Sequence, residues 1–208
     1  MIKIIAIERE FGCGGGAISE QLAARLNWKL YDRQLTAEIA ELAHVEAAVA
    51  QRCDERLDPL LYRLTKVFWR GSYERALPIA DDKIFDADRM IVLVQQVIER
   101  AARDGQCVIV GRGAPWFLRG RADTLSVFLF APRSEKVRRL ASRVKDQAEA
   151  GQLLDTVDEE RAAYIKRYFG KEWPTRALYH VMLNTALGDE ICISMILDLM
   201  EAVNRRHI

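Results

Sequence analysis

The stretch that most constrains the fold is a glycine-rich loop between two apolar segments at the start of the chain. Residues 2–7 are rich in β-branched side chains, which predicts a buried strand of a parallel sheet. Four glycines follow within residues 12–16, and Ile18, Leu22 and Leu26 then recur on one face of a predicted helix. This layout favours anion binding, because glycines let the backbone approach an anion and a helix N-terminus presents free N–H groups.

The loop lacks the lysine of the Walker pattern G-x-x-x-x-G-K-[ST]. If Gly14 is the second glycine of that pattern, Gly15 stands at the lysine position, and the next two residues carry no hydroxyl group. Arg9 is a candidate for the missing cation, whereas Glu10 would oppose a phosphate unless it faces away or pairs with an arginine. The glycines could instead only allow a tight turn, but three consecutive glycines exceed what a turn needs, so we favour anion binding.

Length and composition indicate one domain with a sizeable core. The chain has 208 residues, half of them hydrophobic, and a net charge of +1, which argues against nucleic-acid binding by charge alone. The cysteines form no C-x-x-C pair or Cys/His cluster, so no metal site is expected, and Cys107 and Cys192 should be packed thiols. We find no signal-peptide pattern and no apolar stretch near the roughly 20 residues of a membrane helix, and we expect a cytoplasmic protein.

Short apolar runs alternate with helical patterns along the chain, which predicts a parallel α/β sheet with helices on both faces. Ligands of such folds bind beyond the carboxyl ends of the strands. Gly151 is expected to divide two basic helices. The predicted strands are residues 2–7, 28–32, 107–110, 125–130 and 178–183. The predicted later helices are residues 34–70 with a break at Pro59, 85–104, 134–150, 155–169 and 189–205.

Charged residues follow two of the predicted strands. Asp32 and Arg33 come after the second strand, where they are candidates to hold a phosphate or a hydroxyl group of a substrate. The alternative is that Asp32 only caps a helix while Arg33 is solvated. Arg112 stands between Gly111 and Gly113 after the third strand, a position from which a guanidinium can fork onto a phosphate. The alternative there is a surface arginine in a turn.

Basic residues are concentrated in and after the two predicted helices on either side of Gly151. Most surface charges are only solvated, but two successive basic helices suggest a mobile lid that closes on a polyphosphate and neutralises its charge. We expect a few of these residues, not all, to reach the site. They are Arg133, Arg138, Arg139, Arg143, Arg161, Lys166, Arg167, Lys171 and Arg176.

Segments along nearly the whole chain resemble the cytidylate kinase-like family, which is similar to bacterial cytidylate kinases and other nucleoside monophosphate kinases of the P-loop class. The loop pattern R-E-F-G-x-G-G is fairly specific. The matching segments are Arg9-Glu10-Phe11-Gly12-Cys13-Gly14-Gly15, Tyr31-Asp32-Arg33, Val108-Ile109-Val110-Gly111-Arg112-Gly113, Asp158-Glu159-Glu160-Arg161 and Tyr168-Phe169.

The resemblance implies a three-layer, P-loop NTPase-like α/β fold with a five-stranded parallel sheet of order 2-3-1-4-5. It implies one kinase-like domain over residues 1–208, with a helical insertion of the NMP-binding type at residues 33–104 and a lid at residues 151–176. The implied reaction transfers the γ-phosphoryl group of ATP, with Mg²⁺, to a nucleoside monophosphate such as CMP. The implied partner is a small nucleotide, and neither nucleic acid nor a membrane is expected.

The resemblance also implies roles for single residues, with no metal ligand among them. Arg9 joins the phosphate-binding set as the candidate cation. The set expected to hold the donor phosphates is Arg9, Gly12, Cys13, Gly14, Gly15, Gly16 and Ala17. The substrate-binding set is Asp32, Arg33, Arg112 and Arg139. The catalytic set is Arg112, Arg143, Arg161 and Arg167.

Three functional hypotheses remain open at the level of the sequence. The leading one is a phosphotransferase acting on a nucleotide or another small acceptor, and convergence of the arginines on the loop would support it. The second is a catalytically weak nucleotide-binding protein that acts as a regulatory or interaction switch, which the missing lysine supports. The third is a structural homologue without a ligand. Dimerisation through the apolar helices of residues 34–104 is a further hypothesis.

Overall fold

The computed structural model describes residues 1–32, 38, 87–141, 144 and 146–206. Its centre is a parallel sheet of five strands in the order β2-β3-β1-β4-β5, which confirms the predicted order. The strands are β1 (Ile4–Arg9), β2 (Lys29–Tyr31), β3 (Cys107–Val110), β4 (Thr124–Phe130) and β5 (Val181–Asn184).

The central strand β1 pairs in parallel with β3 on one side and β4 on the other. Ile7 lies opposite Val110, the last residue of β3, and Arg9 lies opposite Leu129, close to the end of β4. Because the strands are parallel, their carboxyl ends meet at one edge of the sheet. The glycine loop, the turn after β3 and the segment after β2 therefore open onto the same edge.

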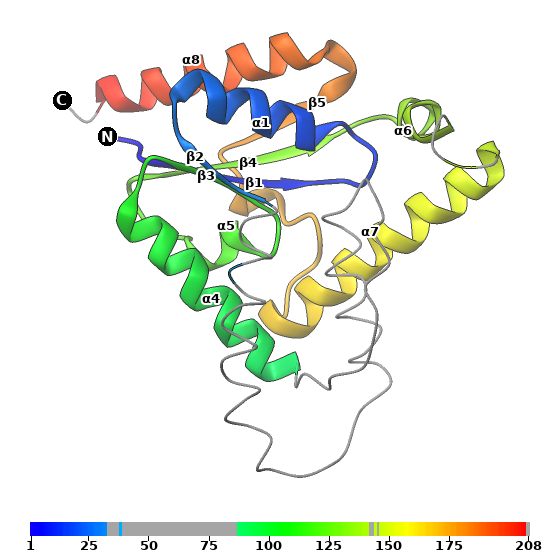
Figure 1. Cartoon of the computed structure of the whole chain (residues 1–208), viewed down its shortest axis with the longest axis horizontal. Helices are drawn as coiled ribbons and strands as arrows, with labels where there is room; N and C mark the ends of the chain where they lie inside the picture. The colour runs from blue at the N-terminus through cyan, green and yellow to red at the C-terminus, as the bar shows by residue number, and fades with distance from the viewer. Residues whose placement is uncertain (33–37, 39–86, 142–143, 145, 207–208) are drawn as a thin grey trace.

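Helices cover both faces of the sheet (Figure 1). They are α1 (Gly15–Leu26), α4 (Ala87–Asp104), α5 (Ala114–Phe117), α6 (Arg133–Ala141), α7 (Gln147–Phe169) and α8 (Asp189–Arg206), with short 3₁₀ turns η1 (Arg176–Leu178) and η2 (Thr185–Leu187). In Figure 1, α1 and α8 lie above the sheet, and α4 and α5 lie below it. Among the described residues, no helix is both long and apolar enough to cross a membrane.

The alternation of side chains along β1 builds two cores. Ile5 and Ile7 pack with α1 and α8, whereas Ile4 and Ala6 pack with α4 and α5. A third, smaller core joins the glycine loop to α6 and α7 through Phe11 and partners on both helices. Since β1 is buried on both faces, the strand is rigid, and it carries the glycine loop from a fixed point.

Two sequence-based boundaries are wrong. Gly151 does not divide two helices but lies buried inside the continuous helix α7. A Cβ there would lie 3.2 Å from the guanidinium of Arg133, which donates a hydrogen bond to the Gly151 carbonyl at 3.4 Å, so this glycine allows a close approach between helices. The fifth strand begins at Val181, three residues later than predicted, because Arg176–Leu178 forms a 3₁₀ turn.

Several predictions concern residues that the structure does not describe or does not test. Most of the predicted insertion of residues 33–104, including the helix of residues 34–70, lies outside the described residues. Its described end is α4, whose buried face includes Val94, Val97 and Ile98. The predicted division into an insertion and a lid, and the dimerisation hypothesis, stay predictions. Cys107 and Cys192 are buried, as predicted for packed thiols.

Candidate active site

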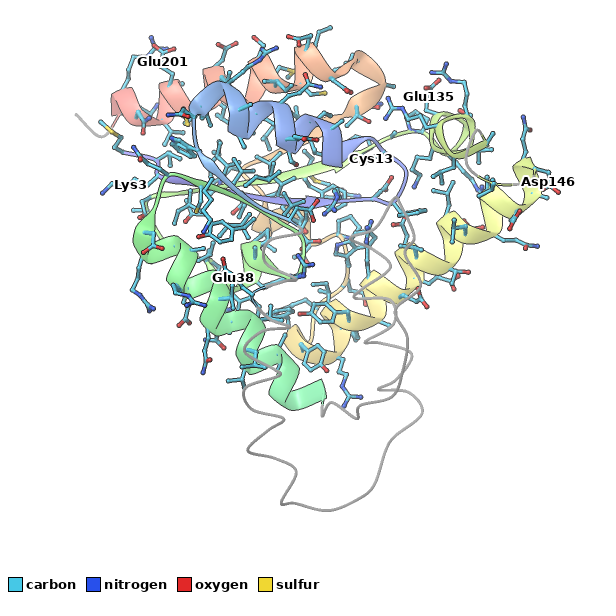
Figure 2. The ribbon with its side chains drawn as sticks, viewed as in Figure 1. Lys3, Cys13, Glu38, Glu135, Asp146 and Glu201 are labelled. Atoms are coloured by element: carbon cyan, nitrogen blue, oxygen red, sulfur yellow. The ribbon has the colours of Figure 1, made fainter. Side chains whose placement is uncertain are left out.

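The glycine loop joins the end of β1 to the start of α1, and Cys13 lies in this turn (Figure 2). Gly14 has a φ of +84°, a left-handed conformation that favours glycine. Its carbonyl accepts hydrogen bonds from the N–H groups of Ala17 and Ile18 at 3.1 and 3.3 Å. A Cβ on Gly16 would meet nothing within 4 Å. The first turn of α1 thus has open space beside Gly16, where an anion-binding turn places its ligand.

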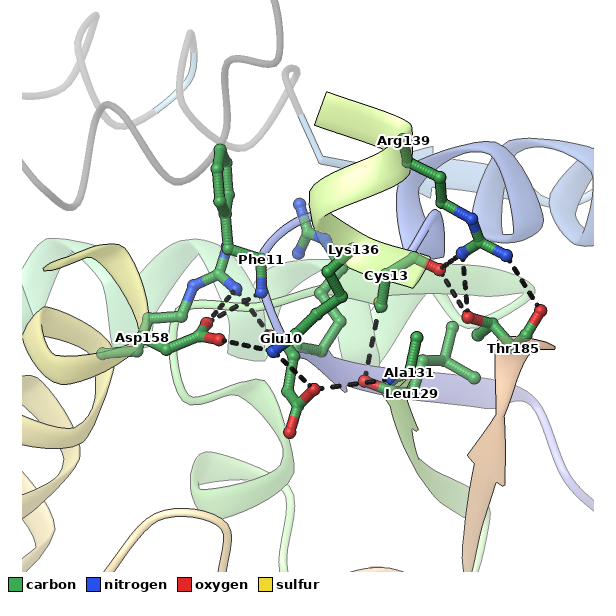
Figure 3. Close-up of polar contacts among 11 residues, drawn as sticks. Glu10, Phe11, Cys13, Leu129, Ala131, Lys136, Arg139, Asp158 and Thr185 are labelled. Carbon is green, nitrogen blue, oxygen red and sulfur yellow. Dashed lines mark hydrogen bonds and ion pairs between the residues drawn. The ribbon is translucent and has the colours of Figure 1, made fainter. Parts of the chain in front are cut away.

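Arg139, on α6, lies directly against the loop (Figure 3). Its guanidinium donates hydrogen bonds to the carbonyl of Cys13 and, at 3.0 Å each, to the side-chain hydroxyl and the carbonyl of Thr185. The Thr185 hydroxyl also donates to the Cys13 carbonyl at 2.5 Å. A Cβ on Gly14 would lie 2.9 Å from Arg139 Nη1. Arg139 therefore joins the loop to the end of β5, and its predicted contact with an acceptor stays a prediction.

Arg9, the last residue of β1, extends across the start of α1. A Cβ on Gly15 would lie 2.9 Å from Arg9 Cδ, and one on Gly111 would lie 3.2 Å from Arg9 Nη1. The guanidinium Nη2 is 3.5 Å from Asp32 Oδ1, and the Arg9 side chain is only 12% exposed. Its charge therefore stands beside the glycine loop, at the carboxyl ends of β1, β2 and β3.

Arg112 forms the centre of the turn after β3. It is buried and has a φ of +56°, an uncommon conformation for a side chain other than glycine. Arg112 Nη1 donates to the backbone carbonyl of Asp32 at 2.8 Å, and the Arg112 carbonyl accepts a hydrogen bond from the Tyr164 hydroxyl at 3.4 Å. Held backbone strain of this kind is concentrated at functional sites. The turn is thus fixed to the end of β2 and to α7.

Glu8 is a buried carboxylate that the sequence patterns did not single out. Its Oε1 accepts a hydrogen bond from the Gly113 N–H at 3.0 Å, and its Oε2 accepts one from Trp173 Nε1–H at 3.3 Å. Burial raises the pKa of Glu8, while the charge of Arg161 acts in the opposite direction. The available signal is a carboxylate inside an otherwise apolar strand, because such residues are rarely fully buried unless they are paired.

An ionic network fastens α6 and α7 to the residues around the loop (Figure 3). Lys136 Nζ lies 2.9 Å from Glu10 Oε2 and 3.2 Å from Asp158 Oδ2. Asp158 Oδ1 also accepts the Phe11 N–H at 2.8 Å. Lys136 has its pKa raised: burial alone would lower it, and these two carboxylates outweigh that effect. Glu10 therefore pairs with a lysine, whereas the alternatives expected from the sequence were that it faces away or pairs with an arginine.

Arg161 reaches the same region from α7. Its Nη1 donates to the carbonyl of Arg9 at 2.7 Å and lies 3.3 Å from Asp158 Oδ1. Burial, followed by the nearby charge of Arg9, lowers the pKa of Arg161. Each of these two guanidinium groups has a carboxylate beside it, Asp32 for Arg9 and Asp158 for Arg161, so the region holds two cations that are already partly compensated.

The structure brings some of the predicted site residues together and separates others. Arg9, Asp32 and Arg112 meet at the carboxyl ends of β1, β2 and β3, and Arg161 holds the backbone of Arg9. Arg167 is on the exposed side of α7, with its guanidinium carbon 5.6 Å from the centre of the Tyr168 ring. Arg33 and Arg143 lie outside the described residues, so the roles predicted for them stay predictions.

The residues of the loop fit a chain of phosphates better than they fit a metal ion. Gly16 leaves open space that a side chain would fill, while the space beside Gly14 holds the guanidinium of Arg139. Among the described residues, no group of three or more His, Cys, Asp or Glu side chains could hold a metal. The hydroxyl of Ser19, the first after the loop, donates to the Gly15 carbonyl at 2.7 Å inside the helix. The Asp32 carboxylate lies beside Arg9, and the Asp32 backbone carbonyl accepts a hydrogen bond from Arg112.

Comparison with solved structures identifies the fold. An uncharacterized protein from Eubacterium ventriosum aligns with a TM-score of 0.69 at 22% identity over 97% of this chain and 99% of its own. The shikimate kinase of Bacteroides thetaiotaomicron aligns with a TM-score of 0.53 at 17% identity, covering 97% and 99%. That of Acinetobacter baumannii, in complex with shikimate, gives 0.52 at 13% identity, covering 97% and 94%. The fold is therefore that of the P-loop kinases.

Comparison of sequences gives a family. No curated protein matches the chain significantly. The model of the cytidylate kinase-like family matches residues 4–187, which include the glycine loop, the turn after β3, both helices of the ionic network and Thr185. This span covers most of the chain, in agreement with the sequence resemblance. The protein belongs to the cytidylate kinase-like family.

Proposed function

We propose that the protein is an ATP-dependent phosphotransferase that phosphorylates a nucleoside monophosphate, such as CMP, or another small acceptor. The observation that carries this proposal is the meeting of two arginines at Asp32. Arg9 Nη2 lies 3.5 Å from the Asp32 carboxylate, and Arg112 Nη1 donates to the Asp32 carbonyl at 2.8 Å. Two guanidinium groups beside a glycine loop suit a transferring phosphoryl group and the anionic acceptor next to it.

Phosphoryl transfer depends on positioning and on neutralised charge more than on covalent help from the protein. In this proposal the N–H groups of the loop hold the donor phosphates, and Arg9 faces the phosphoryl group that moves. Arg112 orients the acceptor from the turn after β3. Arg161 holds the backbone of Arg9 in place through its 2.7 Å hydrogen bond.

Mg²⁺ enters this proposal with ATP. It supplies further charge neutralisation on the phosphates, and it commonly keeps several waters and few protein ligands. Gly16 has no hydroxyl at the position where the Walker pattern has Ser or Thr. The nucleotide and water would therefore provide most ligands, and Asp32 is the carboxylate within reach of the same region.

The nature of the acceptor is open between a phosphate oxygen and a hydroxyl group. The family name suggests a nucleoside monophosphate, while two solved structures with this fold are shikimate kinases. Arg112 suits an acceptor with a phosphate or a carboxylate, because its fork binds either group with two parallel hydrogen bonds. We favour the nucleoside monophosphate, since family membership rests on the sequence itself.

The test is ATP consumption with Mg²⁺ against a panel of acceptors that includes CMP, the other nucleoside monophosphates and shikimate. We expect turnover with at least one member and product that carries the γ-phosphate of labelled ATP. Arg112→Ala should reduce this turnover, whereas Arg205→Ala, which removes an exposed arginine paired with Glu201 at 3.3 Å, should leave it unchanged. Measurable ATP binding without turnover on any acceptor would favour the nucleotide-dependent switch instead.

A further inference from the structure

Arg9 and Gly15 compete for one space. A Cβ on Gly15 would lie 2.9 Å from Arg9 Cδ and 3.2 Å from Arg9 Cβ, distances at which one of the two side chains must move. Gly15 lies in the first turn of α1 and is not among the residues with positive φ. The backbone therefore does not demand glycine at this position. The crowding comes from neighbouring side chains, chiefly Arg9 and then the Cys13 thiol, whose Sγ would lie 3.3 Å from the Cβ.

The neighbouring glycine shows that this crowding is local. A Cβ on Gly16 would meet nothing within 4 Å. The loop could thus accept a side chain at residue 16, one position beyond the lysine of the Walker pattern, but not at residue 15. The absence of a lysine at residue 15 and the position of the Arg9 side chain are therefore linked, because the two side chains would occupy the same space.

The Arg9 side chain passes Gly15, and its guanidinium ends between the turn after β3 and the end of β2. Its Nη1 lies 3.2 Å from the place of a Cβ on Gly111, and its Nη2 lies 3.5 Å from Asp32 Oδ1. Asp32 thereby holds the side chain in position across a distance that is longer than an ordinary hydrogen bond. An incoming phosphate can form shorter, charge-assisted bonds with the same guanidinium.

We propose that Arg9 supplies from β1 the cation that a Walker lysine supplies from the following helix, and that Gly15 is glycine to leave room for it. This inference rests on the proposed function, because it takes the ligand to be the outer phosphates of ATP. Arg9 is the third residue before Gly12, so the cation comes from the strand side of the loop. Replacing Arg9 by alanine and Gly15 by lysine should therefore restore a cation at the lysine position of the Walker pattern.

The experiment compares four proteins: the unaltered chain, Arg9→Ala, Gly15→Lys, and the double variant Arg9→Ala/Gly15→Lys. Calorimetry gives the Kd for ATP and for AMP, which lacks the outer phosphates. We expect Arg9→Ala to weaken ATP binding roughly tenfold or more, as for a lost hydrogen bond to a charged group, with little change for AMP. Gly15→Lys alone should also weaken ATP binding, because the lysine collides with Arg9.

The double variant decides the question. We expect it to bind ATP more tightly than Arg9→Ala alone, because the introduced lysine then enters the vacated space. The proposal that Arg9 replaces the Walker lysine would be overturned by either of two results. One is a double variant that binds ATP no better than Arg9→Ala, and the other is an Arg9→Ala protein with unchanged ATP affinity. If thermal melting shows that Arg9→Ala does not fold, Arg9→Gln keeps most of the side-chain volume without its charge and replaces it in the series.

The measured ATP and AMP affinities test the role of Arg9 separately from the proposed function. A protein that binds ATP through Arg9 but transfers no phosphate would contradict the proposed phosphotransferase function and would still support the role of Arg9 as the cation. A protein that transfers phosphate equally well without Arg9 would contradict only the role of Arg9 as the cation. Arg205→Ala, an exposed position on α8, controls for the general loss of one positive charge and should leave both affinities unchanged.

Discussion

Two glycine-rich turns follow neighbouring strands of the sheet, and their glycines are required by different partners. In the loop after β1, a side chain on Gly14 would meet the guanidinium of Arg139, and one on Gly15 would meet Arg9. In the turn after β3, a side chain on Gly113 would lie 2.8 Å from the ring of Phe169. Gly14 and Gly15 thus make room for cations, whereas Gly113 makes room for an aromatic ring at the end of α7.

This difference separates ligand binding from structural support. Guanidinium groups on long side chains can shift when a phosphate arrives. The Phe169 ring, by contrast, stacks on Trp116 with 5.6 Å between ring centres and packs edge-on against Phe117 at 5.2 Å. Changes at Gly14 and Gly15 should therefore affect nucleotide binding, and changes at Gly113 should affect folding first.

The largest expected effect is on ATP binding in Gly14→Val. The branched side chain would enter the space of Arg139 Nη1 at 2.9 Å and would force a residue with a φ of +84° into a strained conformation. We expect ATP affinity to fall by roughly a hundredfold, as for the loss of two hydrogen bonds to charged oxygens. Titration calorimetry with ATP measures this loss.

The matched control for this variant is Gly120→Val. Gly120 has a similar φ of +81°, but a Cβ there would meet nothing within 4 Å. It should share the backbone strain of Gly14→Val and keep the affinity for ATP. Unchanged ATP binding in folded Gly14→Val would remove the loop from the nucleotide site.

The second effect is on stability in Gly113→Ala. The new methyl group would collide with Phe169 at 2.8 Å, and residue 113 would keep a φ of +71°. We expect a loss of about 2–4 kcal/mol in the free energy of unfolding, the sum of overpacking and a left-handed conformation. Urea unfolding measures the loss.

A double-mutant cycle identifies its cause. In a Phe169→Leu background the same alanine should cost less, because the ring is absent. Gly170→Ala, at a φ of +66° with nothing within 4 Å of its Cβ, should cost only the backbone strain. Equal losses at residues 113 and 170 would mean that the ring contact does not matter.

The same two turns indicate which parts of the fold and of the candidate site can be predicted from the sequence. The alternation of apolar runs and helical patterns predicts the sheet, and the rule that ligands meet parallel strands at their carboxyl ends brings Asp32 and Arg112 into the candidate site. Pairings across long separations could not be predicted from the sequence. Lys136 and Glu10 are 126 residues apart, and Glu8 looks like part of a strand until Trp173 and Gly113 lie next to it.

Local rules also fail where tertiary packing prevails. Glycine has low helix propensity, which predicts a break between helices at Gly151. In the structure, Arg133 and the small core around Leu154 hold α7 continuous through that position. The direction of Arg9 is similar, because only the fold decides whether an arginine at the end of β1 points into solvent or across Gly15.

The third effect concerns the acceptor and is expected in Arg112→Lys. Lysine keeps the charge but loses the planar fork and the ability to hold Asp32 with one nitrogen while facing a ligand with another. We expect the KM for the acceptor to rise roughly tenfold, as for one charge-assisted hydrogen bond, while the KM for ATP changes much less. Steady-state kinetics with each substrate varied in turn measures the two values. An equal rise in both would place Arg112 in general support of the site.

The smallest effect is a pH dependence carried by Glu8, whose hydrogen bond from Gly113 holds the second turn. Because burial raises its pKa above the ordinary value of 4.5, the folded protein keeps a proton that the unfolded chain releases as pH rises above that value. The contribution of Glu8 to the free energy of unfolding therefore decreases with rising pH until its folded-state pKa is passed.

Glu8→Gln should remove this dependence. The amide can still accept from Gly113, but it sets an N–H group against Trp173 Nε1–H, so we expect a loss of about 1 kcal/mol at low pH that shrinks as pH rises. Urea unfolding of both proteins from about pH 5 to pH 8 measures the difference. Glu135→Gln on the surface of α6 is the control: Arg138 lowers the pKa of Glu135, so this carboxyl titrates below the measured range and its replacement should leave the pH dependence of stability unchanged. A difference between Glu8→Gln and the unaltered protein that grows with pH would mean that Glu8 is held in its charged form by the arginines around it.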